Sequence, residues 1–235
     1  MHIFYSENHS GRQFVLDNSE SNHLARVLRL KNGDSVEVVN GDGNLYHCVV
    51  LENDPRNSKV EIVETVENFD ARGYRLHIAI APTKSIDRFE FFVEKSVEIG
   101  VDEITPIISS RSERKQLKTE RIERVILSAM KQSLKAKRTI INPVTPLTEF
   151  LKINKPGKMF IAHCIDSLPQ HPLEEVYDKG DEATVLIGPE GDFTEDEVKS
   201  AINKGASPLS LGSSRLRTET AGIVACSHVY FLNQL

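Results

Sequence analysis

The chain changes its pattern near residue 73, and this change constrains its fold more than any other feature. Before it, four β-rich or alternating segments follow one another at short intervals. After it, short apolar runs alternate with segments that have the 3.6-residue periodicity of helices. The division predicts a small β-domain followed by a larger α/β domain. We expect domains at 1–70 and 71–235, with a linker at 67–73.

The first domain is expected to be a small β-barrel, because its strands are short and closely spaced. The stretch 40–44, Asn-Gly-Asp-Gly-Asn, predicts a tight turn, since these residues accept positive φ. The expected strands are 14–16, 35–39, 45–51 and 59–64.

One segment of this domain has helical spacing instead. It would place Leu24, Val27 and Leu28 on one face and bring Arg26 beside Arg29, three residues further on. The expected helix is 22–30.

The second domain is expected to be a mostly parallel α/β sheet, because its apolar runs are interleaved with helical patterns. A helix over 87–99 should end at Gly100, and a capping box from Thr194 to Glu197 should open a helix that Gly205 closes. The expected strands are 76–80, 104–108, 159–162, 184–187 and 208–211.

Charge is distributed unevenly along the chain. The net charge is −5, yet residues 111–138 carry ten basic and three acidic side chains. The spacing predicts a helix over 119–137 whose polar face is basic. Such a face is often only a solvated surface, but few acidic residues balance it here, which favours a phosphate-binding surface. Its members are Arg121, Arg124, Ser128, Lys131 and Lys135.

Two loops after expected strands contain glycine and charged residues. Residues 186–193 read Leu-Ile-Gly-Pro-Glu-Gly-Asp-Phe, and residues 211–221 contain Leu-Gly-Ser-Ser-Arg-Leu-Arg-Thr-Glu-Thr-Ala. Glycine lets a backbone approach a ligand closely, and α/β sheets bind small molecules at the carboxyl ends of their strands. Simple turns would not need the charged residues in these loops, which are Glu190, Arg215, Arg217 and Glu219. We therefore expect a ligand site at these loops.

Several motifs are missing from the sequence. It has no G-x-G-x-x-G, no P-loop and no G-x-S-x-G, and its histidines lack zinc-type spacing, so we expect no metal. Three widely spaced cysteines fit a reducing compartment. The chain has neither a secretory signal pattern nor the about 20 apolar residues of a membrane helix. We expect a cytoplasmic protein with no membrane partner.

The two loops together closely resemble the SPOUT superfamily, and more narrowly the RsmE family of 16S ribosomal RNA uridine-N3 methyltransferases. The resemblance extends over nearly the whole chain. Shorter matching stretches lie at 23–29, at 94–101 and at Gln132-Ser133.

The resemblance implies a PUA-like N-terminal barrel that binds RNA and a C-terminal parallel sheet tied in a trefoil knot, a rare feature in proteins. It also implies S-adenosylmethionine (SAM) as cofactor, a homodimer, and small-subunit rRNA or an assembled 30S particle as partner. Carried over by position, the cofactor residues are His163, Leu186, Ile187, Gly188, Pro189, Glu190, Gly191, Leu211, Gly212, Leu216 and Arg217. The expected RNA contacts are Arg26, Arg29, Arg121, Arg124, Lys131, Gln132 and Lys135.

The sequence departs from the family pattern at two places. Asp192 stands where the family more often has glycine, and Lys131 and Leu134-Lys135 replace an acidic residue and Gly-Arg around Gln-Ser. The second departure concerns the expected RNA contacts, but it keeps or adds positive charge.

Methylation at N3 of uridine requires that the N3 proton leave, so a general base or a cation that stabilises the anion is expected. Glu219 is the candidate base and Arg217 the candidate cation, although Glu219 could equally cap its own helix. Two other readings stay open. One is a SPOUT enzyme that modifies another rRNA or tRNA nucleotide, and the other is a non-catalytic RNA-binding ribosome-assembly factor.

Overall fold

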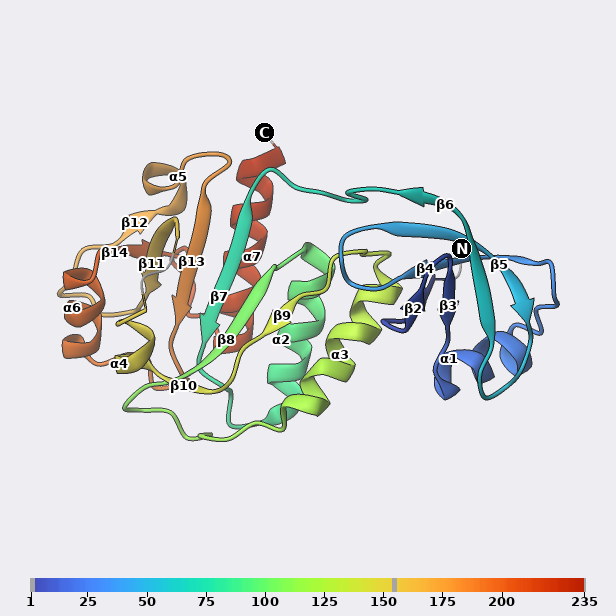
Figure 1. Ribbon diagram of the computed structural model, residues 1–235. Helices are drawn as coiled ribbons and strands as arrows, with labels where there is room; N and C mark the ends of the chain where they lie inside the picture. Colours follow the sequence, from blue (N-terminus) through green and yellow to red (C-terminus); the bar gives the residue numbers. More distant parts are fainter. Residues whose placement is uncertain (1–2, 154–155, 235) are drawn as a thin grey trace. The chain divides into compact units, whose positions relative to one another are not determined.

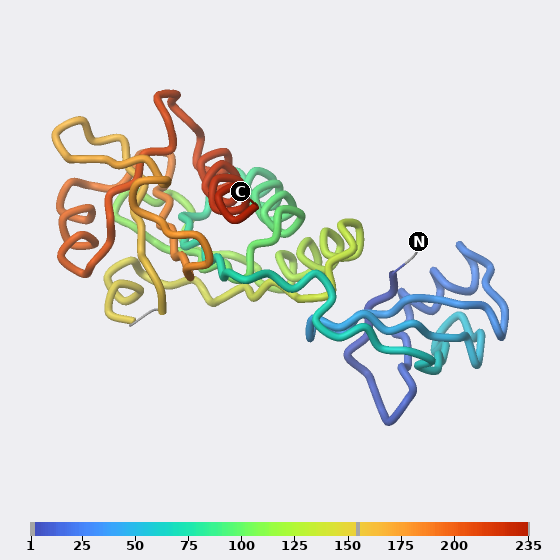
Figure 2. The backbone as a smooth tube through the Cα atoms, turned by 90° about the horizontal axis from the view of Figure 1, so that it is seen from above, coloured from blue at the N-terminus to red at the C-terminus, as the bar shows by residue number. Residues whose placement is uncertain are grey.

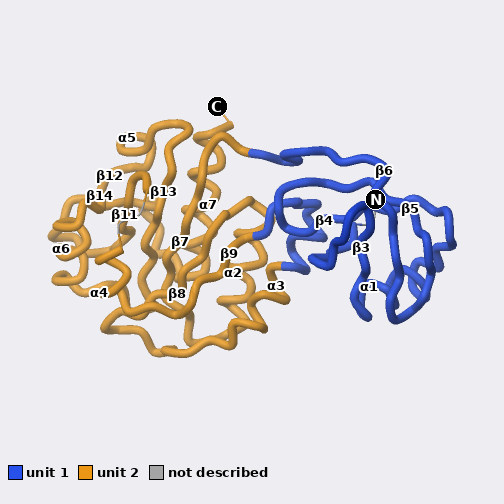
Figure 3. Tube along the Cα trace, in the orientation of Figure 1, with its two compact units in different colours: residues 1–71, 127–138 blue, residues 72–126, 139–235 orange. Residues whose placement is uncertain are grey.

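The computed structural model of the protein describes residues 3–153 and 156–234 (Figure 1). The chain divides into two compact units (Figure 3). Unit 1 consists of Met1–Ala71 and Leu127–Arg138, and unit 2 of Arg72–Ile126 and Thr139–Leu235. Helix α3, Thr119–Gln132, is divided between them. No pattern in the sequence indicates that residues 127–138 group with the first unit.

Unit 1 contains one six-stranded sheet in the order β1-β4-β5-β6-β3-β2. The β1–β4 pair is parallel and the other pairs are antiparallel. All four expected strands are confirmed, whereas β1 and β2 are too short to show a pattern. The strands are β1 Ile3–Tyr5, β2 His9–Ser10, β3 Gln13–Val15, β4 Ser35–Val39, β5 Leu45–Glu52 and β6 Lys59–Val66.

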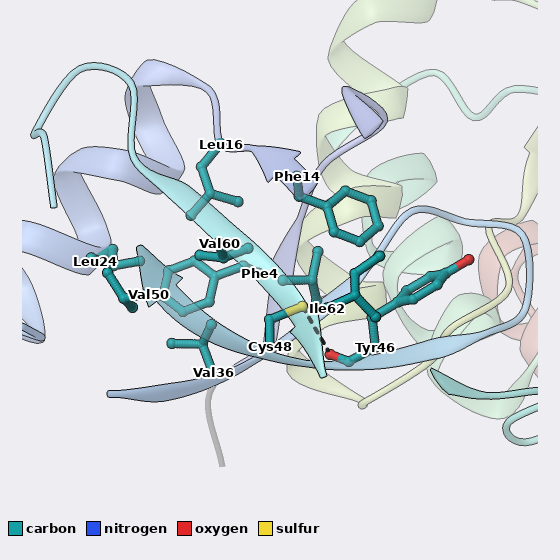
Figure 4. Packing of buried hydrophobic residues seen from close by; sticks show 11 residues of the cluster. Phe4, Phe14, Leu16, Leu24, Val36, Tyr46, Cys48, Val50, Val60 and Ile62 are labelled. Carbon is teal, nitrogen blue, oxygen red and sulfur yellow. Dashed lines mark hydrogen bonds between the residues drawn. The ribbon is translucent and has the colours of Figure 1, made fainter. Parts of the chain in front are cut away.

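A single hydrophobic core holds this unit together. The alternating strand residues point inward and meet aromatic rings, with the centroids of Phe14 and Tyr46 5.0 Å apart (Figure 4). Gly41 and Gly43, in the expected turn, both have positive φ. A Cβ at Gly41 would come within 2.9 Å of the Arg138 Cβ, so only glycine fits there. The core consists of Phe4, Phe14, Leu16, Leu24, Val36, Val38, Tyr46, Cys48, Val50, Val60 and Ile62.

The helix expected at 22–30 is wrong in its bounds. The structure has α1 at Asn18–Asn22, followed by a π-helical turn, η1, at His23–Val27. The Asp17 side chain accepts a hydrogen bond from the Glu20 N–H, a capping signal that the sequence does contain.

The π-turn also changes which side chains share a face. The Leu28 N–H donates to the His23 carbonyl, five residues back, so the turn is wider than an α-helical one. Leu24 is buried as expected, but Val27 is 61% exposed. Arg29 lies past the end of the helix with a φ of 55°, so helical spacing does not bring it beside Arg26.

Unit 2 contains an eight-stranded sheet in which every pairing is parallel. The order is β10-β8-β7-β13-β11-β14-β12, and β9 also pairs with β8. The five expected strands are confirmed, and the two-residue strands were missed. The strands are β7 Arg75–Ile80, β8 Glu103–Ile108, β9 Ile140–Ile141, β10 Thr145–Pro146, β11 Lys158–Ala162, β12 His171–Pro172, β13 Glu182–Ile187 and β14 Ala206–Ser210. The knot implied by the resemblance stays a prediction.

Helices cover both faces of this sheet. Ala79 and Ile80 are successive residues of β7, so their side chains point to opposite faces. Ala79 packs in the core cluster that includes α4 and α6 residues, whereas Ile80 contacts the position of Gly222 in α7. On that second face α2 and α7 lie side by side (Figure 2). The remaining helices are α2 Ile86–Ile99, α4 Leu147–Phe150, α5 Leu173–Val176, α6 Glu195–Asn203 and α7 Thr218–Gln234.

The expected helix signals are largely confirmed. Gly100 ends α2 with a φ of 112°, and Thr194 forms the capping box of α6. The expected end of α3 at 137 is wrong, because the helix stops at Gln132. Leu134 takes a φ of 58°, and the Lys135 N–H donates to the Met130 carbonyl at 2.9 Å, which closes the helix.

Strand register brings the two glycine loops together. Ala162, the last residue of β11, pairs with Ile187 at the end of β13 and with Leu209 near the end of β14. Because the three strands are parallel neighbours, the segments that follow them leave the sheet at the same edge.

Candidate active site

A cavity of about 1190 Å³ lies at the carboxyl ends of β11, β13 and β14. Its volume exceeds the roughly 300–1,000 Å³ of common small-molecule sites. Nearly all of the expected cofactor residues line it: His163, Ile187, Gly188, Pro189, Glu190, Gly191, Leu211, Gly212, Leu216 and Arg217. Leu186 does not, because it is fully buried in the core between the sheet and α6.

The loop after β13 is held by residues from two other segments. The Glu190 Oε1 accepts a hydrogen bond from the Lys84 N–H at 2.9 Å. Arg111, which also lines the cavity, donates from Nη1 to the Gly191 carbonyl at 2.8 Å. A Cβ on Gly191 would lie 3.3 Å from the Arg111 Cβ. The absence of a side chain at 191 therefore lets the arginine approach this loop.

Asp192 connects this loop to the one after β11. Its Oδ1 accepts from the Phe193 N–H at 2.7 Å, and its Oδ2 accepts from the Cys164 N–H at 2.8 Å. Its backbone has a φ of 61°. Both Asp192 and Cys164 line the cavity, and the sequence predicted neither as a site residue. The sequence marked Asp192 only as a departure from the family pattern and gave no signal that its carboxylate reaches Cys164.

His163 is a buried, polar part of the cavity wall. It is 5% exposed, and its Nδ1 accepts from the Ile165 N–H at 3.2 Å. The neutral ring therefore carries its proton on Nε2, and this nitrogen is buried. Burial lowers the pKa of His163, which the negative charge of Asp192 and a hydrogen bond to the Pro169 backbone partly oppose. The wall thus offers a neutral imidazole N–H.

The second glycine loop contributes a left-handed backbone turn and positive charge. Gly212 has a φ of 103°, and a Cβ there would meet no atom within 4 Å. Conformation, not crowding, is what requires glycine at this position. Arg215 and Arg217 are exposed and line the cavity.

Glu219 lies in the first turn of α7 and is buried, with 7% of its surface exposed. Its Oε1 is 3.9 Å from the Arg88 Nε, and its Oε2 has no hydrogen-bond partner among the described residues. Glu219 does not itself line the cavity, whereas Thr218 and Ala221 of the same turn do. The structure therefore places the two expected catalytic residues at different depths, with Arg217 at the cavity surface.

The basic segment has more acidic partners than its sequence indicated. In unit 2, the Arg121 Nη2 donates to Glu90 at 2.8 Å, and Arg124 contacts the Glu120 carbonyl of its own helix. In unit 1, Lys131 pairs with Glu20, which is buried. The expectation of an unbalanced basic face is corrected here, because the partners come from elements distant in sequence.

Four further residues of the expected RNA contacts lie in unit 1. Lys135 pairs with Asp70 at 2.7 Å, whereas Gln132 is exposed, as are Arg26 and Arg29.

Arg114, in the loop before α3, makes structural hydrogen bonds to backbone carbonyls. The Arg114 Nε donates to the Thr83 carbonyl at 3.0 Å, and its Nη2 to the Lys84 carbonyl at 2.7 Å. Glu197 of α6 accepts from the N–H and hydroxyl of Ser110. Burial would raise the pKa of Glu197, but the hydrogen bonds from Thr194 and Ser110 outweigh it and lower that pKa. This loop is therefore fixed against the segments that form the cavity.

The residues that the structure describes are 3–153 and 156–234. Within them, no group of three or more His, Cys, Asp or Glu residues is arranged to hold a metal ion. No helix in that part of the chain has the length and apolar character needed to cross a bilayer.

Comparison with known proteins gives matches over both units. Residues 71–230 match the model of an RNA methyltransferase domain, and residues 16–63 that of an RNA methyltransferase PUA domain. Ribosomal RNA small subunit methyltransferase E from Aquifex aeolicus is 30% identical over 239 residues, covering 94% of this chain and 95% of its own.

Solved structures agree with these matches. A "probable rRNA-methyltransferase" from Porphyromonas gingivalis superposes with a TM-score of 0.92 at 39% identity, over 100% of this chain and 99% of its own. Ribosomal RNA small subunit methyltransferase E from Neisseria gonorrhoeae, solved bound to S-adenosyl methionine, gives 0.88 at 25% identity, over 99% and 98%. The chain belongs to the ribosomal RNA small subunit methyltransferase E family, the RsmE family that its loop motifs resemble.

Proposed function

We propose that the protein is a SAM-dependent methyltransferase that methylates N3 of a uridine in small-subunit ribosomal RNA. One observation carries the proposal: both glycine loops and His163 line a single cavity at one sheet edge. Family membership adds the reaction class, and the relative from Neisseria gonorrhoeae was solved with this cofactor.

The cavity residues fit a nucleoside cofactor. Gly212 leaves open space at the cavity wall, where a ligand can approach the backbone. The polar ring of His163 and the charged side chains of Glu190 and Arg217 line the same cavity. Bound SAM supplies a methyl group activated by its sulfonium for in-line displacement. The protein's task is to hold donor and acceptor in line, which is chiefly a positioning problem.

Proton removal from N3 is assigned to Glu219, with Arg217 stabilising the uridine anion. The Glu219 Oε2 makes no hydrogen bond within the described chain, so its lone pairs are free for a proton. The observed contacts do not use this carboxylate to cap α7. Arg217, at the cavity surface, would face the O2 or O4 charge that develops as the proton leaves.

RNA contacts are assigned to three exposed arginines and to the exposed Gln132. Arg124 in unit 2, and Arg26, Arg29 and Gln132 in unit 1, present their side chains to solvent. Lys131 and Lys135 keep their positive charge but already have acidic partners, so their share of phosphate binding is expected to be smaller. The N3 edge takes part in base pairing, so the target uridine must be unpaired or flipped out.

A homodimer is the proposed assembly in the cytoplasm. Helix α7 is apolar around much of its circumference and many of its residues are only half-buried. Phe231 on α7 and Phe91 on the adjacent α2 are 62% and 50% exposed. An apolar helix that its own fold leaves partly uncovered fits burial against a second copy.

Calorimetry with SAM and methylation assays test the function together. We expect SAM binding by the purified chain, and methyl transfer to small-subunit rRNA or to 30S particles from a strain that lacks the gene. Mapping at nucleotide resolution should find one N3-methyluridine. Transfer to a different RNA or atom would replace the substrate assignment, and SAM binding without transfer to any RNA would favour a non-catalytic factor.

Glu219→Gln tests the base. It should reduce kcat by on the order of 10²–10⁴-fold, while the calorimetric affinity for SAM changes little because Glu219 does not line the cavity. Full turnover by this variant across the pH range would remove Glu219 from the mechanism.

A further inference from the structure

We propose that Asp192 is the positioning residue of the cofactor cavity: its carboxylate ties the loop after β13 to the loop after β11 and holds both in the form that binds SAM. This inference rests on the proposed function and deepens it. Asp192 would act without touching the reacting atoms, through the shape of the two walls that it joins.

The geometry of the carboxylate carries the proposal. One oxygen accepts from the Phe193 N–H at 2.7 Å and fixes the side chain against its own loop. The other accepts from the Cys164 N–H at 2.8 Å, across 28 positions of sequence. Hydrogen bonds from an N–H to an ionised oxygen are stronger than neutral ones. One side chain therefore joins two separate segments at the cavity wall.

The backbone of Asp192 supports the same role. Its φ of 61° lies in the left-handed region, where a side chain carries a steric cost that glycine avoids. Its own N–H donates to the Pro189 carbonyl at 2.9 Å, which closes the turn. A turn of this shape would form more easily with glycine. The carboxylate and its two hydrogen bonds offset the conformational cost.

The loop after β13 has other attachments, and the loop after β11 has fewer. Arg111 donates to the carbonyls of Gly191 and Phe193, at 2.8 and 3.4 Å. On the other side, the segment from His163 to Ile165 is closed by the local Ile165 N–H to His163 Nδ1 bond. Loss of the Asp192 carboxylate should therefore loosen this segment while Arg111 keeps the β13 loop in place.

A loosened wall weakens binding because SAM must then order it. The ordering cost appears in affinity and in KM for SAM, and not in the methyl-transfer step once the site is saturated. The proposal thus predicts a split: a higher Kd and KM for SAM, with kcat nearly unchanged.

Two variants and one matched control test the inference. Asp192→Asn keeps the shape and one acceptor oxygen but removes the charge, and Asp192→Gly removes the link and also the backbone cost. Asn68→Gly is the control, since Asn68 is exposed, has a φ of 52° and lies in unit 1.

The first measurement is amide hydrogen exchange on the SAM-free protein, so it does not depend on the proposed function. Exchange at the Cys164 amide should become at least about tenfold faster in Asp192→Gly, because its hydrogen bond to the carboxylate is lost. The acceleration should be smaller in Asp192→Asn, where one neutral acceptor oxygen remains. The exchange rate should not change in Asn68→Gly. Unchanged protection of Cys164 in both Asp192 variants would overturn the proposal.

The second measurement is SAM affinity by calorimetry, with KM and kcat from the methylation assay. Both Asp192 variants should bind SAM about tenfold more weakly with kcat within about twofold of the parent. Equal SAM affinity in parent and variants would refute the positioning role and leave the proposed function intact. Failure of the parent to bind SAM would instead refute the proposed function.

A spectroscopic signature separates this role from general damage to the fold. Asp192→Asn removes the negative charge that partly opposes the burial effect on His163. The pKa of His163 should therefore fall further, as followed by NMR titration of the ring. A His163 pKa that did not move would mean that the Asp192 carboxylate is not held beside this segment, which contradicts the proposed link.

Discussion

Two of the described non-glycine residues with left-handed backbone stand where the resemblance to the RsmE family implies glycine. Leu134, with a φ of 58°, ends α3, and Asp192, with a φ of 61°, turns the loop after β13. The two residues differ in what offsets the steric cost of this conformation. The Asp192 carboxylate accepts two hydrogen bonds, whereas the Leu134 side chain is 38% exposed and buries little apolar surface. Asp192 therefore contributes to the cavity wall, whereas the conformational cost at Leu134 has no comparable contact to offset it.

Leu134→Gly should therefore stabilise the protein. The left-handed penalty of about 1–2 kcal/mol disappears, and the greater freedom of glycine in the unfolded chain offsets part of it. We expect the free energy of unfolding in urea to rise by about 0.5–1 kcal/mol. Leu134→Ala is the control, because it shortens the side chain but keeps the Cβ that causes the penalty. A gain of equal size from alanine would point to the exposed side chain instead.

The three cysteines should differ in reactivity. Burial raises the pKa of the Cys48 and Cys226 thiols to about 12. Cys164 is exposed at the cavity, and burial, followed by the charge of Asp192, raises its pKa as well. Since the thiolate is the reactive form, alkylation at Cys164 should be slow at neutral pH and accelerate as the pH rises.

Mass spectrometry after iodoacetamide treatment checks this order. Cys164 should be the one modified thiol of the folded protein, and saturating SAM should protect it because it lines the cavity. Modification of Cys164 at the same rate with and without SAM would contradict the placement of the cofactor.

At the scale of elements, α3 has a regular apolar stripe, and its residues belong partly to unit 2 and partly to unit 1. Its apolar stripe is buried as expected, with Ile122, Ile126 and Met130 at 1% exposure or less. The basic face, in contrast, is partly neutralised by acidic residues from other elements. Lys131 reaches Glu20 in α1, and Lys135 reaches Asp70. These pairs give the second half of α3, and the segment that follows it, a structural role within unit 1.

Lys131→Met should destabilise unit 1, because it leaves the buried Glu20 carboxylate without its cation. The expected loss is about 1–3 kcal/mol in the free energy of unfolding. A double-mutant cycle with Glu20→Gln measures the pair itself, and the double variant should lose less than the sum of the two single variants. Simple additivity would mean that the pair contributes nothing to stability.

At the scale of the whole molecule, an acidic protein can bind RNA if its exposed cations gather where the RNA lies. The net charge of −5 therefore excludes little. Ion pairs already occupy several basic side chains of residues 111–138, so fewer of them are available to bind phosphate. Arg124 is available, because it is exposed and, among the hydrogen bonds described, contacts only the Glu120 carbonyl of its own helix. RNA affinity should depend on a few exposed residues more than on the total of the basic segment.

Arg124→Glu should weaken RNA binding and reduce the slope of log K against log salt by about 1, as expected for one lost phosphate contact. Lys199→Glu is the matched control: it changes the net charge equally, but Lys199 lies on α6, where it pairs with Glu195. Titration of small-subunit RNA at several salt concentrations checks both. Equal effects of the two variants would indicate a response to net charge alone.

Much of the architecture could be predicted because its causes are local. Periodicity identified the main strands of both units, the Gly100 end of α2 and the capping box of α6. The errors also have physical causes. A π-turn rotated Val27 to the surface, and a left-handed leucine ended α3 before residue 137. Neither event leaves a signal in hydrophobic spacing.

The candidate site likewise has features that the sequence predicts and features that it does not. The sequence by itself determined which loops carry glycine and charge after apolar strands, and family motifs identified their chemistry. Only the tertiary structure decided that these loops share one cavity, that Leu186 stays in the core, and that Asp192 joins two walls. The physical reason is the separation along the sequence over which each interaction acts. Backbone preferences act between near neighbours, whereas parallel strand pairing, ion pairs and the Asp192 hydrogen bond join residues from 25 to more than 100 positions apart.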